Sequence, residues 1–358
     1  MSTAIRVVVV DGSPFMYRLL MSHRSSAPDL HIIGMVCNAT RALNMVKELQ
    51  PDVVMLDLDT PKLDGLQVLD CLMHECPTPV VLVSSISLDA ATLTLKGVEM
   101  GAVDFILKET QQDNPEMLCG HIAAKIRAAS RIRVIRSLRL RHAPSPTASS
   151  LCTSTEQPQC DDLGVAERVV VIGASTGGPN ALRDLLSLLP ADFPAVILVV
   201  QHIPKAFAAV LAAQLCHCTA LAVQIATHGC RLTAGTALIA PGGVHLRLGP
   251  DARVQLDEGP AVGGHCPAID ITMESVAQAY GRRTMGIVLT GMGADGAKGL
   301  MAIHAAGGEA FAQDAASCVV DGMPQRARET GVVDYIGTPV QIARRLLAAP
   351  WAHRRNTA

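Results

Sequence analysis

Residues 169–186 read VVVIGASTGGPNALRDLL, and this stretch decides the fold predicted for the C-terminal half of the chain. Its four leading apolar residues run without interruption into a glycine-rich turn, and leucines at helical spacing follow. An unbroken apolar run is typical of a strand buried on both faces, as in parallel sheets that helices cover. The segment therefore predicts a strand, a tight turn and a helix.

The same order of apolar run, polar or glycine residue and helical stretch recurs in both halves of the chain. The runs are RVVVVD (6–11), DVVMLD (52–57), PVVLVSS (79–85), DFILK (104–108), RVVVIG (168–173), AVILVVQ (195–201), TALIAP (236–241) and MGIVLTG (285–291). Both halves are therefore predicted to be doubly wound parallel-sheet α/β domains. In such domains, ligands and catalytic groups gather beyond the C-terminal ends of the strands.

The length of 358 residues favours two domains. Residues 143–167 lose hydrophobic periodicity and are rich in Pro, Ser, Thr and acidic side chains, which indicates a flexible linker. We therefore expect one domain at 1–142, which ends in a helix over 121–142, a second domain at 168–349, and a tail at 350–358. The arginine-rich face of that helix is interpreted as a solvated surface.

The composition argues against several function classes. The net charge is −2, so no basic field favours nucleic acid. No apolar run approaches the roughly 20 residues of a membrane span, and the N-terminal run is too short for a signal peptide. We expect a soluble, cytoplasmic protein without membrane insertion. The eleven scattered cysteines are interpreted as free thiols rather than as metal ligands.

The C-terminal half contains the three residue types of a hydrolase triad, each after a predicted strand. Gly173, Ser175 and Gly177 fit G-x-S-x-G, a turn that exposes a serine hydroxyl, although a structural turn is the alternative. His202 follows AVILVVQ and can accept the serine proton. Asp295 lies in a glycine-rich loop after MGIVLT and could orient His202. The order Ser, His, Asp differs from that of the α/β-hydrolases and argues against that fold.

The N-terminal half contains Asp11, Asp57, Ser84 and Lys108 at predicted strand ends. Their convergence indicates a phosphoryl site. Asp57 would accept the phosphoryl group, Asp11 and Asp57 would bind Mg²⁺, and Ser84 and Lys108 would hold phosphate oxygens.

These motifs resemble the bacterial chemotaxis protein-glutamate methylesterases, which are response regulators. The resemblance runs from about Arg6 to about Leu347, except for the linker. It rests on IGASTGGP (172–179), VVQHIP (199–204), APGGVHL (240–246), VLTGMGADGAKGL (288–300) and AQDAASCVVDGMP (312–324), and on VVVVDGSPFMYRLL (7–20) and PDVVMLDLDTPKLDG (51–65), which look like a flavodoxin-like receiver domain.

The resemblance implies that Ser175 attacks glutamate methyl esters on the cytoplasmic helices of methyl-accepting chemoreceptors. The same acyl intermediate would deamidate particular receptor glutamines. The resemblance also implies that His202 acts as the base, and that the Met292 N–H and groups near Thr176 bind the oxyanion. It implies no cofactor for the esterase. In the receiver, a chemotaxis histidine kinase would phosphorylate Asp57 with Mg²⁺ present and so relieve a block of the active site.

The sequence departs from the family pattern at three places. Gly12 stands where the family usually has a second acidic residue beside Asp11, so we expect weaker Mg²⁺ binding, which Gly12→Asp should strengthen. Lys108-Glu109 replaces Lys-Pro, which argues against a cis-proline bond there. The segment HCPAIDITMES (265–275) lacks the usual Arg before Pro and Ser after it, which bears on substrate fit.

Two other functions stay open at this point. One is a signalling or binding protein with a degenerate receiver and a non-catalytic C-terminal scaffold, against which Ser175, His202 and Asp295 argue. The other is a general esterase for small substrates, although the sequence shows no lipase-like lid or acyl pocket.

Overall fold

The computed structural model describes residues 4–12, 15–22, 27–60, 64–108, 115–132, 166–249 and 251–349. The chain divides into two compact units, Met1–His142 and Ala143–Ala358, which are described separately here. Most of the expected linker (143–165), the last part of the expected helix (133–142) and the tail (350–358) lie outside the described residues.

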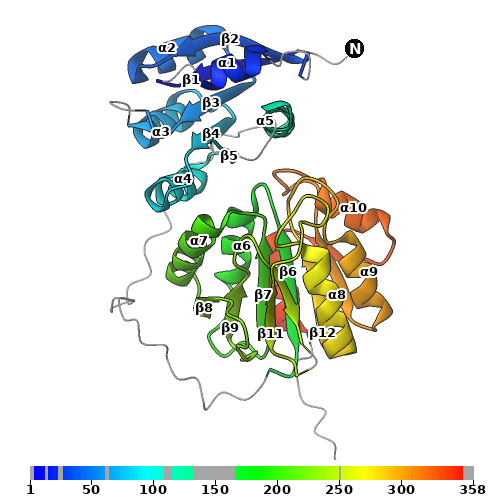
Figure 1. Ribbon diagram of the computed structural model, residues 1–358. Helices are drawn as coiled ribbons and strands as arrows, with labels where there is room; N and C mark the ends of the chain where they lie inside the picture. The colour runs from blue at the N-terminus through cyan, green and yellow to red at the C-terminus, as the bar shows by residue number, and fades with distance from the viewer. Residues whose placement is uncertain are drawn as a thin grey trace, which may run out of the picture. The chain divides into compact units, whose positions relative to one another are not determined.

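The N-terminal unit is a parallel sheet covered by helices (Figure 1). Its described strands pair in the order β2-β1-β3-β4-β5, the flavodoxin-like order expected of a receiver. Helix α1 contacts α5, whereas α2 contacts α3 and α3 contacts α4. The elements are β1 (Ile5–Val10), α1 (Phe15–Ser22), β2 (Leu30–Val36), α2 (Ala39–Leu49), β3 (Val53–Asp57), α3 (Gly65–Glu75), β4 (Val80–Ser84), α4 (Leu88–Met100), β5 (Asp104–Leu107) and α5 (Pro115–Ser130).

The strands of this unit form as predicted because their apolar runs are buried on both faces. Every residue of β3 and β4 is buried. Three of the helices begin at a side-chain cap, in which Asn38, Asp64 or Ser87 accepts a hydrogen bond from an N–H of the first turn. The strand registers bring the C-terminal ends of the central strands to one edge, since Val10 lies opposite Leu56.

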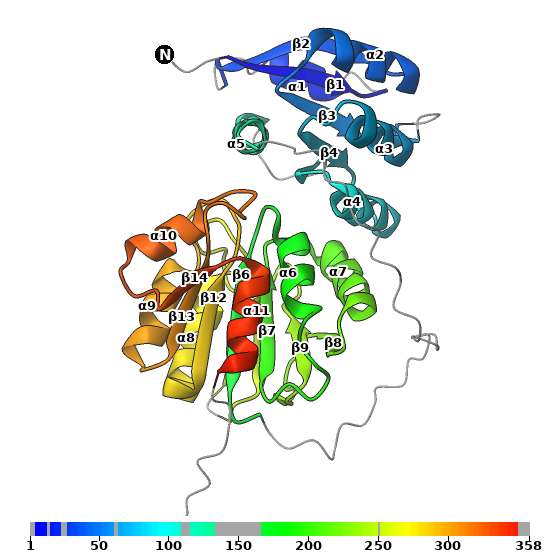
Figure 2. The ribbon, with the colours of Figure 1, turned by 180° about the vertical axis from the view of Figure 1, so that it is seen from behind.

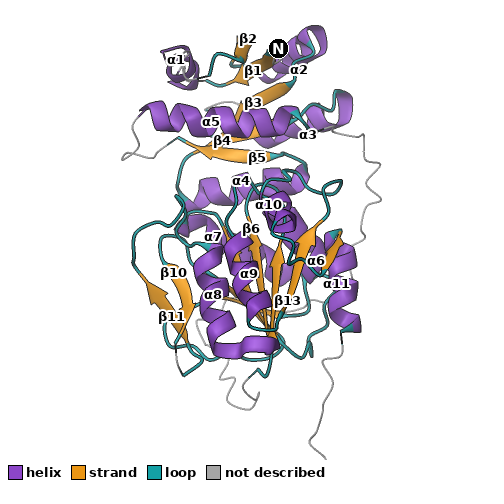
Figure 3. Cartoon of the chain, turned by 90° about the vertical axis from the view of Figure 1, so that its right-hand side faces the viewer, coloured by secondary structure: helices purple, strands orange, loops and turns teal. Residues whose placement is uncertain are grey.

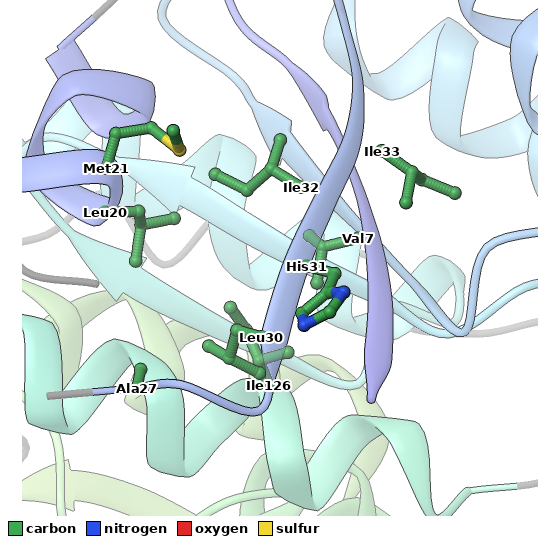
Figure 4. A pocket seen from close by; sticks show the side chains of 9 residues that line it. All are labelled: Val7, Leu20, Met21, Ala27, Leu30, His31, Ile32, Ile33 and Ile126. Carbon is green, nitrogen blue, oxygen red and sulfur yellow. The ribbon is translucent and has the colours of Figure 1, made fainter. Parts of the chain in front are cut away.

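A pocket in the N-terminal unit lies beside β1, β2, α1 and α5 (Figure 4). Its lining is apolar except for His31. None of the site residues predicted from the sequence lines it.

The C-terminal unit contains a larger parallel sheet, with described strands in the order β14-β13-β12-β6-β7-β9-β8, and an antiparallel hairpin, β10-β11. The strands are β6 (Val169–Ala174), β7 (Val196–Gln201), β8 (Ala222–Ile225), β9 (Thr236–Ile239), β10 (His245–Leu248), β11 (Val254–Asp257), β12 (Thr284–Val288), β13 (Glu309–Gln313) and β14 (Tyr335–Gly337). The helices are α6 (Gly178–Leu186), α7 (Lys205–Cys218), α8 (Ile269–Tyr280), the 3₁₀ helix η2 (Gly281–Arg283), α9 (Ala297–Ala305), α10 (Met323–Glu329) and α11 (Pro339–Ala348).

Two groups of helices cover this sheet. Helix α6 contacts α7 and α11, and α9 contacts α8 and α10. Figure 2 shows α6, α7 and α11 on the face toward the viewer, and Figure 3 shows α8 and α9 together, with the hairpin β10-β11 beside α8. The sequence-based prediction of two doubly wound α/β units is therefore confirmed.

The order in which the chain adds parallel strands reverses at the centre of the larger sheet. Strand β6 comes first in the sequence and lies between β7 and β12. The chain builds one side of the sheet with β7, β8 and β9 and the other side with β12, β13 and β14. Connections leave in opposite directions beside β6, so the carboxyl ends of β12, β6 and β7 are where a doubly wound sheet places a site.

Candidate active site

Ser175 follows β6 and precedes α6, on the turn that the G-x-S-x-G pattern predicted. Its backbone N–H donates to the Thr290 carbonyl over 3.0 Å, and its carbonyl accepts the Gly178 N–H and the Gln201 side-chain amide, each over 2.8 Å. Gly177 has φ +78°, which favours glycine. The turn is thus fixed to the ends of both neighbouring strands.

His202 follows β7, directly beside the serine turn. The last residues of β6 and β7, Ala174 and Gln201, are register partners, and the His202 N–H donates to the Ala174 carbonyl over 3.0 Å. The imidazole is 7% exposed, and its Nε2 lies 2.8 Å from Asp295 Oδ2. Its Nδ1 is buried and has no hydrogen-bond partner among the described residues, so the structure forms no Ser175–His202 hydrogen bond there.

Asp295 lies in the loop between β12 and α9, and its carboxylate is 8% exposed. Oδ2 accepts the Ile269 N–H over 2.7 Å in addition to His202, and Oδ1 accepts the Asp270 N–H over 2.9 Å. The carboxylate therefore lies at the N-terminus of α8, where backbone N–H groups favour negative charge. Burial works toward a higher pKa, but the hydrogen bonds from His202, Asp270 and Ile269 outweigh it and lower the pKa of Asp295.

Asp270 is a member of this network that the sequence analysis missed. Its Oδ1 accepts the Gly296 and Gly299 N–H groups, each over 2.8 Å, at the N-terminus of α9. The loop before α9 thus caps α8 through Asp295, while α8 caps α9 through Asp270. Burial and the charge of Asp295 raise the pKa of Asp270. An acidic residue in the first turn of a helix was the available signal, but no helix had been predicted at this position.

His265 is a second missed residue, and it stacks on His202. The two ring centroids are 3.8 Å apart and the ring planes differ by 6°. His265 belongs to the segment before α8 that departs from the family pattern, which also contains the cis Cys266–Pro267 bond. The face of the candidate base is therefore covered by another imidazole.

The loop after β12 lies directly against Ser175. A Cβ atom added to Gly291 would lie 2.7 Å from Ser175 Cβ, so glycine permits this close approach. The next residue is Met292, whose N–H has no acceptor among the described residues. Thr176 is buried, and its carbonyl accepts the Thr290 hydroxyl over 2.9 Å. Both predicted oxyanion residues therefore lie near the serine. Thr176 follows Ser175 in the sequence, and Met292 follows Gly291, which packs against Ser175.

The receiver residues also lie at or just after the C-terminal ends of their strands, where a side-chain contact joins Lys108 to Asp57. Asp57 and Asp11 are each 2% exposed. Lys108 Nζ lies 2.6 Å from Asp57 Oδ1. Burial opposes the charge of Lys108, but its bond to Asp57 outweighs burial and raises the pKa of Lys108. The Ser84 hydroxyl instead accepts from Thr94 over 2.8 Å.

Within the described residues, no group of three or more His, Cys, Asp or Glu side chains is placed to hold a metal ion. No helix of the described chain is long and apolar enough to cross a bilayer. Glu109, where the sequence argued against a cis-proline bond, lies outside the described residues.

The two units together define a response regulator with a hydrolase-type output domain, since a receiver-type sheet precedes a doubly wound sheet with a Ser, His and Asp at adjacent strand ends. The family model for the response regulator receiver domain matches residues 7–117, and that for the CheB methylesterase matches residues 170–346. The chain belongs to the protein-glutamate methylesterase/protein-glutamine glutaminase family. The family resemblance inferred from the motifs is therefore confirmed.

Similarity to individual relatives extends over nearly the whole chain. A protein-glutamate methylesterase/protein-glutamine glutaminase of Symbiobacterium thermophilum is 40% identical over 333 residues, which are 91% of this chain and 92% of that protein. Another from Dechloromonas aromatica is 39% identical over 96% of this chain and 98% of that protein. The crystal structure of the Thermotoga maritima CheB methylesterase catalytic domain is 39% identical, with a TM-score of 0.50, and covers 50% of this chain and 97% of that domain.

Proposed function

We propose that this protein hydrolyses glutamate methyl esters, and deamidates specific glutamines, on methyl-accepting chemoreceptors through Ser175, His202 and Asp295. The observation that carries the proposal is the 2.8 Å pairing of His202 with Asp295 beside the Ser175 turn. The relatives named above are protein-glutamate methylesterases and protein-glutamine glutaminases, which supplies the substrate class. The receptor's methylated helices would place the reaction in the cytoplasm.

The reaction begins with proton transfer from Ser175 to His202. Because Nε2 faces the Asp295 carboxylate, a neutral His202 carries its proton there and leaves Nδ1 as the acceptor. The serine oxygen attacks the ester carbonyl carbon, and the carbonyl electron pair moves to the oxygen. The tetrahedral intermediate collapses, the bond to the methoxy oxygen breaks, and His202 protonates the departing methanol. A glutamine would release ammonia by the same steps.

Hydrolysis of the acyl-enzyme repeats the sequence with water. His202 takes a proton from the attacking water and returns it to Ser175 as the acyl bond breaks. Asp295 stays ionised and stabilises the imidazolium that forms in both halves of the reaction, because its lowered pKa keeps the carboxylate charged. The Met292 N–H and groups near Thr176 would bind the oxyanion.

We further propose that a chemotaxis histidine kinase phosphorylates Asp57 and that the unphosphorylated receiver blocks the esterase. Mg²⁺ fits this site as a weakly held ion, because the buried carboxylates Asp11 and Asp57 follow the register partners Val10 and Leu56. Proteins commonly bind Mg²⁺ through one or two carboxylates and several waters. When bound, the ion would neutralise the charge that gathers among the carboxylate and phosphate oxygens.

The test is methanol release from a methylated receptor, with a small nitrophenyl ester as a second substrate. We expect receptor turnover to be lost in Ser175→Ala, with the fold intact by circular dichroism. Asp251→Asn, a change at an exposed residue outside the triad, serves as the control. Near-wild-type turnover in Ser175→Ala would show that another residue is the nucleophile. Hydrolysis of the nitrophenyl ester alone would indicate a general esterase.

A further inference from the structure

Thr60 has no role in the function proposed above, yet its side chain is bonded to the predicted phosphoacceptor. It is 6% exposed and lies three residues after Asp57. Its hydroxyl donates to Asp57 Oδ2 over 3.1 Å and accepts the Gly12 N–H over 2.9 Å. We name the three residues Gly12, Asp57 and Thr60 the Thr60 clasp.

The clasp occupies the space in which a side chain at position 12 would begin. A Cβ atom added to Gly12 would lie 2.3 Å from Thr60 Cγ2, closer than real Cβ contacts. Threonine is β-branched and has few χ1 positions, and turning its methyl group away would also move the hydroxyl from both partners. An acidic residue at position 12 and the observed Thr60 rotamer therefore exclude each other.

The hydroxyl also competes for Asp57 itself. Oδ1 already accepts from Lys108 and from the Asp59 N–H, over 2.6 and 2.9 Å. The bond from Thr60 uses a lone pair of Oδ2, so protein groups bond to both oxygens of the carboxylate. Mg²⁺ binding, or attack on phosphorus through Oδ2, would have to compete with Thr60 for this oxygen.

We propose that Thr60, paired with Gly12, restrains Asp57 and sets both the Mg²⁺ affinity and the phosphorylation rate of this receiver. The inference rests on the proposed phosphorylation of Asp57 and deepens it. The expectation from the sequence is thereby revised, because the missing acid at position 12 accounts for only part of the weaker Mg²⁺ binding. The bond from Thr60 to Asp57 accounts for the rest. Gly12→Asp alone should bring little gain, since the new side chain meets Thr60.

The step to be measured is phosphorylation by phosphoramidate. An Asp57 oxygen attacks phosphorus, an O–P bond forms and the P–N bond breaks. Ammonia leaves with the electron pair of that bond. Mass spectrometry counts the acyl phosphate, with Asp57→Asn as the blank, and titration calorimetry of the full chain measures Mg²⁺ affinity independently.

Two substitutions separate the hydroxyl of Thr60 from its methyl group. Thr60→Val keeps the shape and removes the bond to Asp57, so it should raise Mg²⁺ affinity and phosphorylation rate by roughly tenfold, the size of one hydrogen bond to a charged group. Thr60→Ser keeps the hydroxyl and removes the atom that would meet a side chain at position 12. Alone it should behave like the wild type, and it should allow Gly12→Asp to raise Mg²⁺ affinity.

The clasp is overturned if Thr60→Val binds Mg²⁺ no more tightly than the wild type, or if Gly12→Asp alone gains as much as it does with Thr60→Ser. All variants are small changes whose folding is verified by thermal melting. If Mg²⁺ affinity changes as expected but no variant becomes phosphorylated, the effect of the clasp on Mg²⁺ affinity stands, and the proposed phosphorylation of Asp57 fails together with the effect on its rate. Methanol release plays no part in either measurement, so failure of the esterase proposal remains distinguishable.

Discussion

Asp295 and Asp270 are neighbouring carboxylates whose surroundings change their pKa values in opposite directions. Hydrogen bonds hold the pKa of Asp295 below its ordinary value, while burial and the charge of Asp295 raise that of Asp270. On acidification, Asp270 therefore takes up a proton before Asp295, the carboxylate that contacts His202. This division suits a hydrolase, in which the carboxylate beside the base must stay ionised.

Asp295→Asn should lower both activity and stability. The amide can no longer accept through both oxygens, and its NH₂ group would face N–H donors. We expect a loss of roughly 10³- to 10⁴-fold in kcat, as for the corresponding change in a serine protease triad. A lowered pKa means that the stabilisation by the carboxylate is fully present above the ordinary value of 3.8 and is lost as pH falls through the lower folded value.

Unfolding by urea between pH 3 and 7 measures this difference. The gap between the wild type and Asp295→Asn should stay constant above about pH 5 and shrink below 3.8. The exposed Asp251→Asn is the control, and no such gap is expected for it. A gap that widened toward low pH would contradict the assignment of Asp295 as the ionised member.

His265 should act as a positioning residue for the candidate base. Its ring lies flat on His202, so removing the ring in His265→Ala should let the imidazole rotate and lower kcat several-fold. His265→Phe keeps a flat ring and should recover most of the rate, which distinguishes positioning from proton transfer by His265. Steady-state methanol release measures both. Equal losses in the two variants would show that the imidazole itself is needed.

At the scale of elements, the loop between β12 and α9 presents residues to the serine at close range. Gly291→Ala would place a methyl group 2.7 Å from Ser175 Cβ and 2.3 Å from Met323 Sδ. We expect kcat to fall at least about tenfold and the melting temperature to drop, because overpacking a closed contact displaces its neighbours.

Gly120→Ala is the matched control for this loop. Gly120 lies in α5, where an added Cβ has no atom within 4 Å, so its melting temperature should stay the same or rise. Activity of Gly291→Ala equal to that of Gly120→Ala would show that the loop adjusts without disturbing the serine.

The elements that the sequence predicted are those buried on both faces. Runs such as VVVI in β6 carry an unmistakable pattern because helices cover both sides of a central strand. The edge strand β8 alternates between exposed and half-buried residues, and His31 and Gly34 interrupt the apolar run of the partly buried β2, so neither was predicted. Their strand character comes from pairing with a neighbour rather than from burial.

The candidate site, like the fold, was predictable only in part: the residues at the ends of central strands were found, and those from loops and helices were missed. The three strands followed by Ser175, His202 and Asp295 are neighbours in the sheet. The position of these residues at strand ends therefore indicated that they lie close together. Asp270 and His265 reach the site from α8 and from the loop before it, and sequence periodicity does not determine how closely that loop approaches. Thr60 was missed because the sequence shows the glycine at position 12 but not that Thr60 fills the space left by its missing side chain.

At the scale of the whole molecule, the two units have separate sheets, so the receiver can be removed. A fragment that starts near Glu167 retains every described element of the C-terminal unit. If the unphosphorylated receiver blocks the esterase, this fragment should release methanol from methylated receptor faster than the full chain. The same fragment with Ser175→Ala is the blank. Equal rates in fragment and full chain would argue that this receiver exerts no inhibition.

The distance in sequence between His202 and Asp295 has a consequence for folding. Their hydrogen bond joins residues 93 positions apart, and it requires β7, β6 and β12 to be paired in one sheet. Contacts of such long range are slow to form, because a large loop must close first. On dilution from denaturant, helical circular dichroism should therefore return before catalysis does, and methanol release would report when the centre of the sheet is assembled.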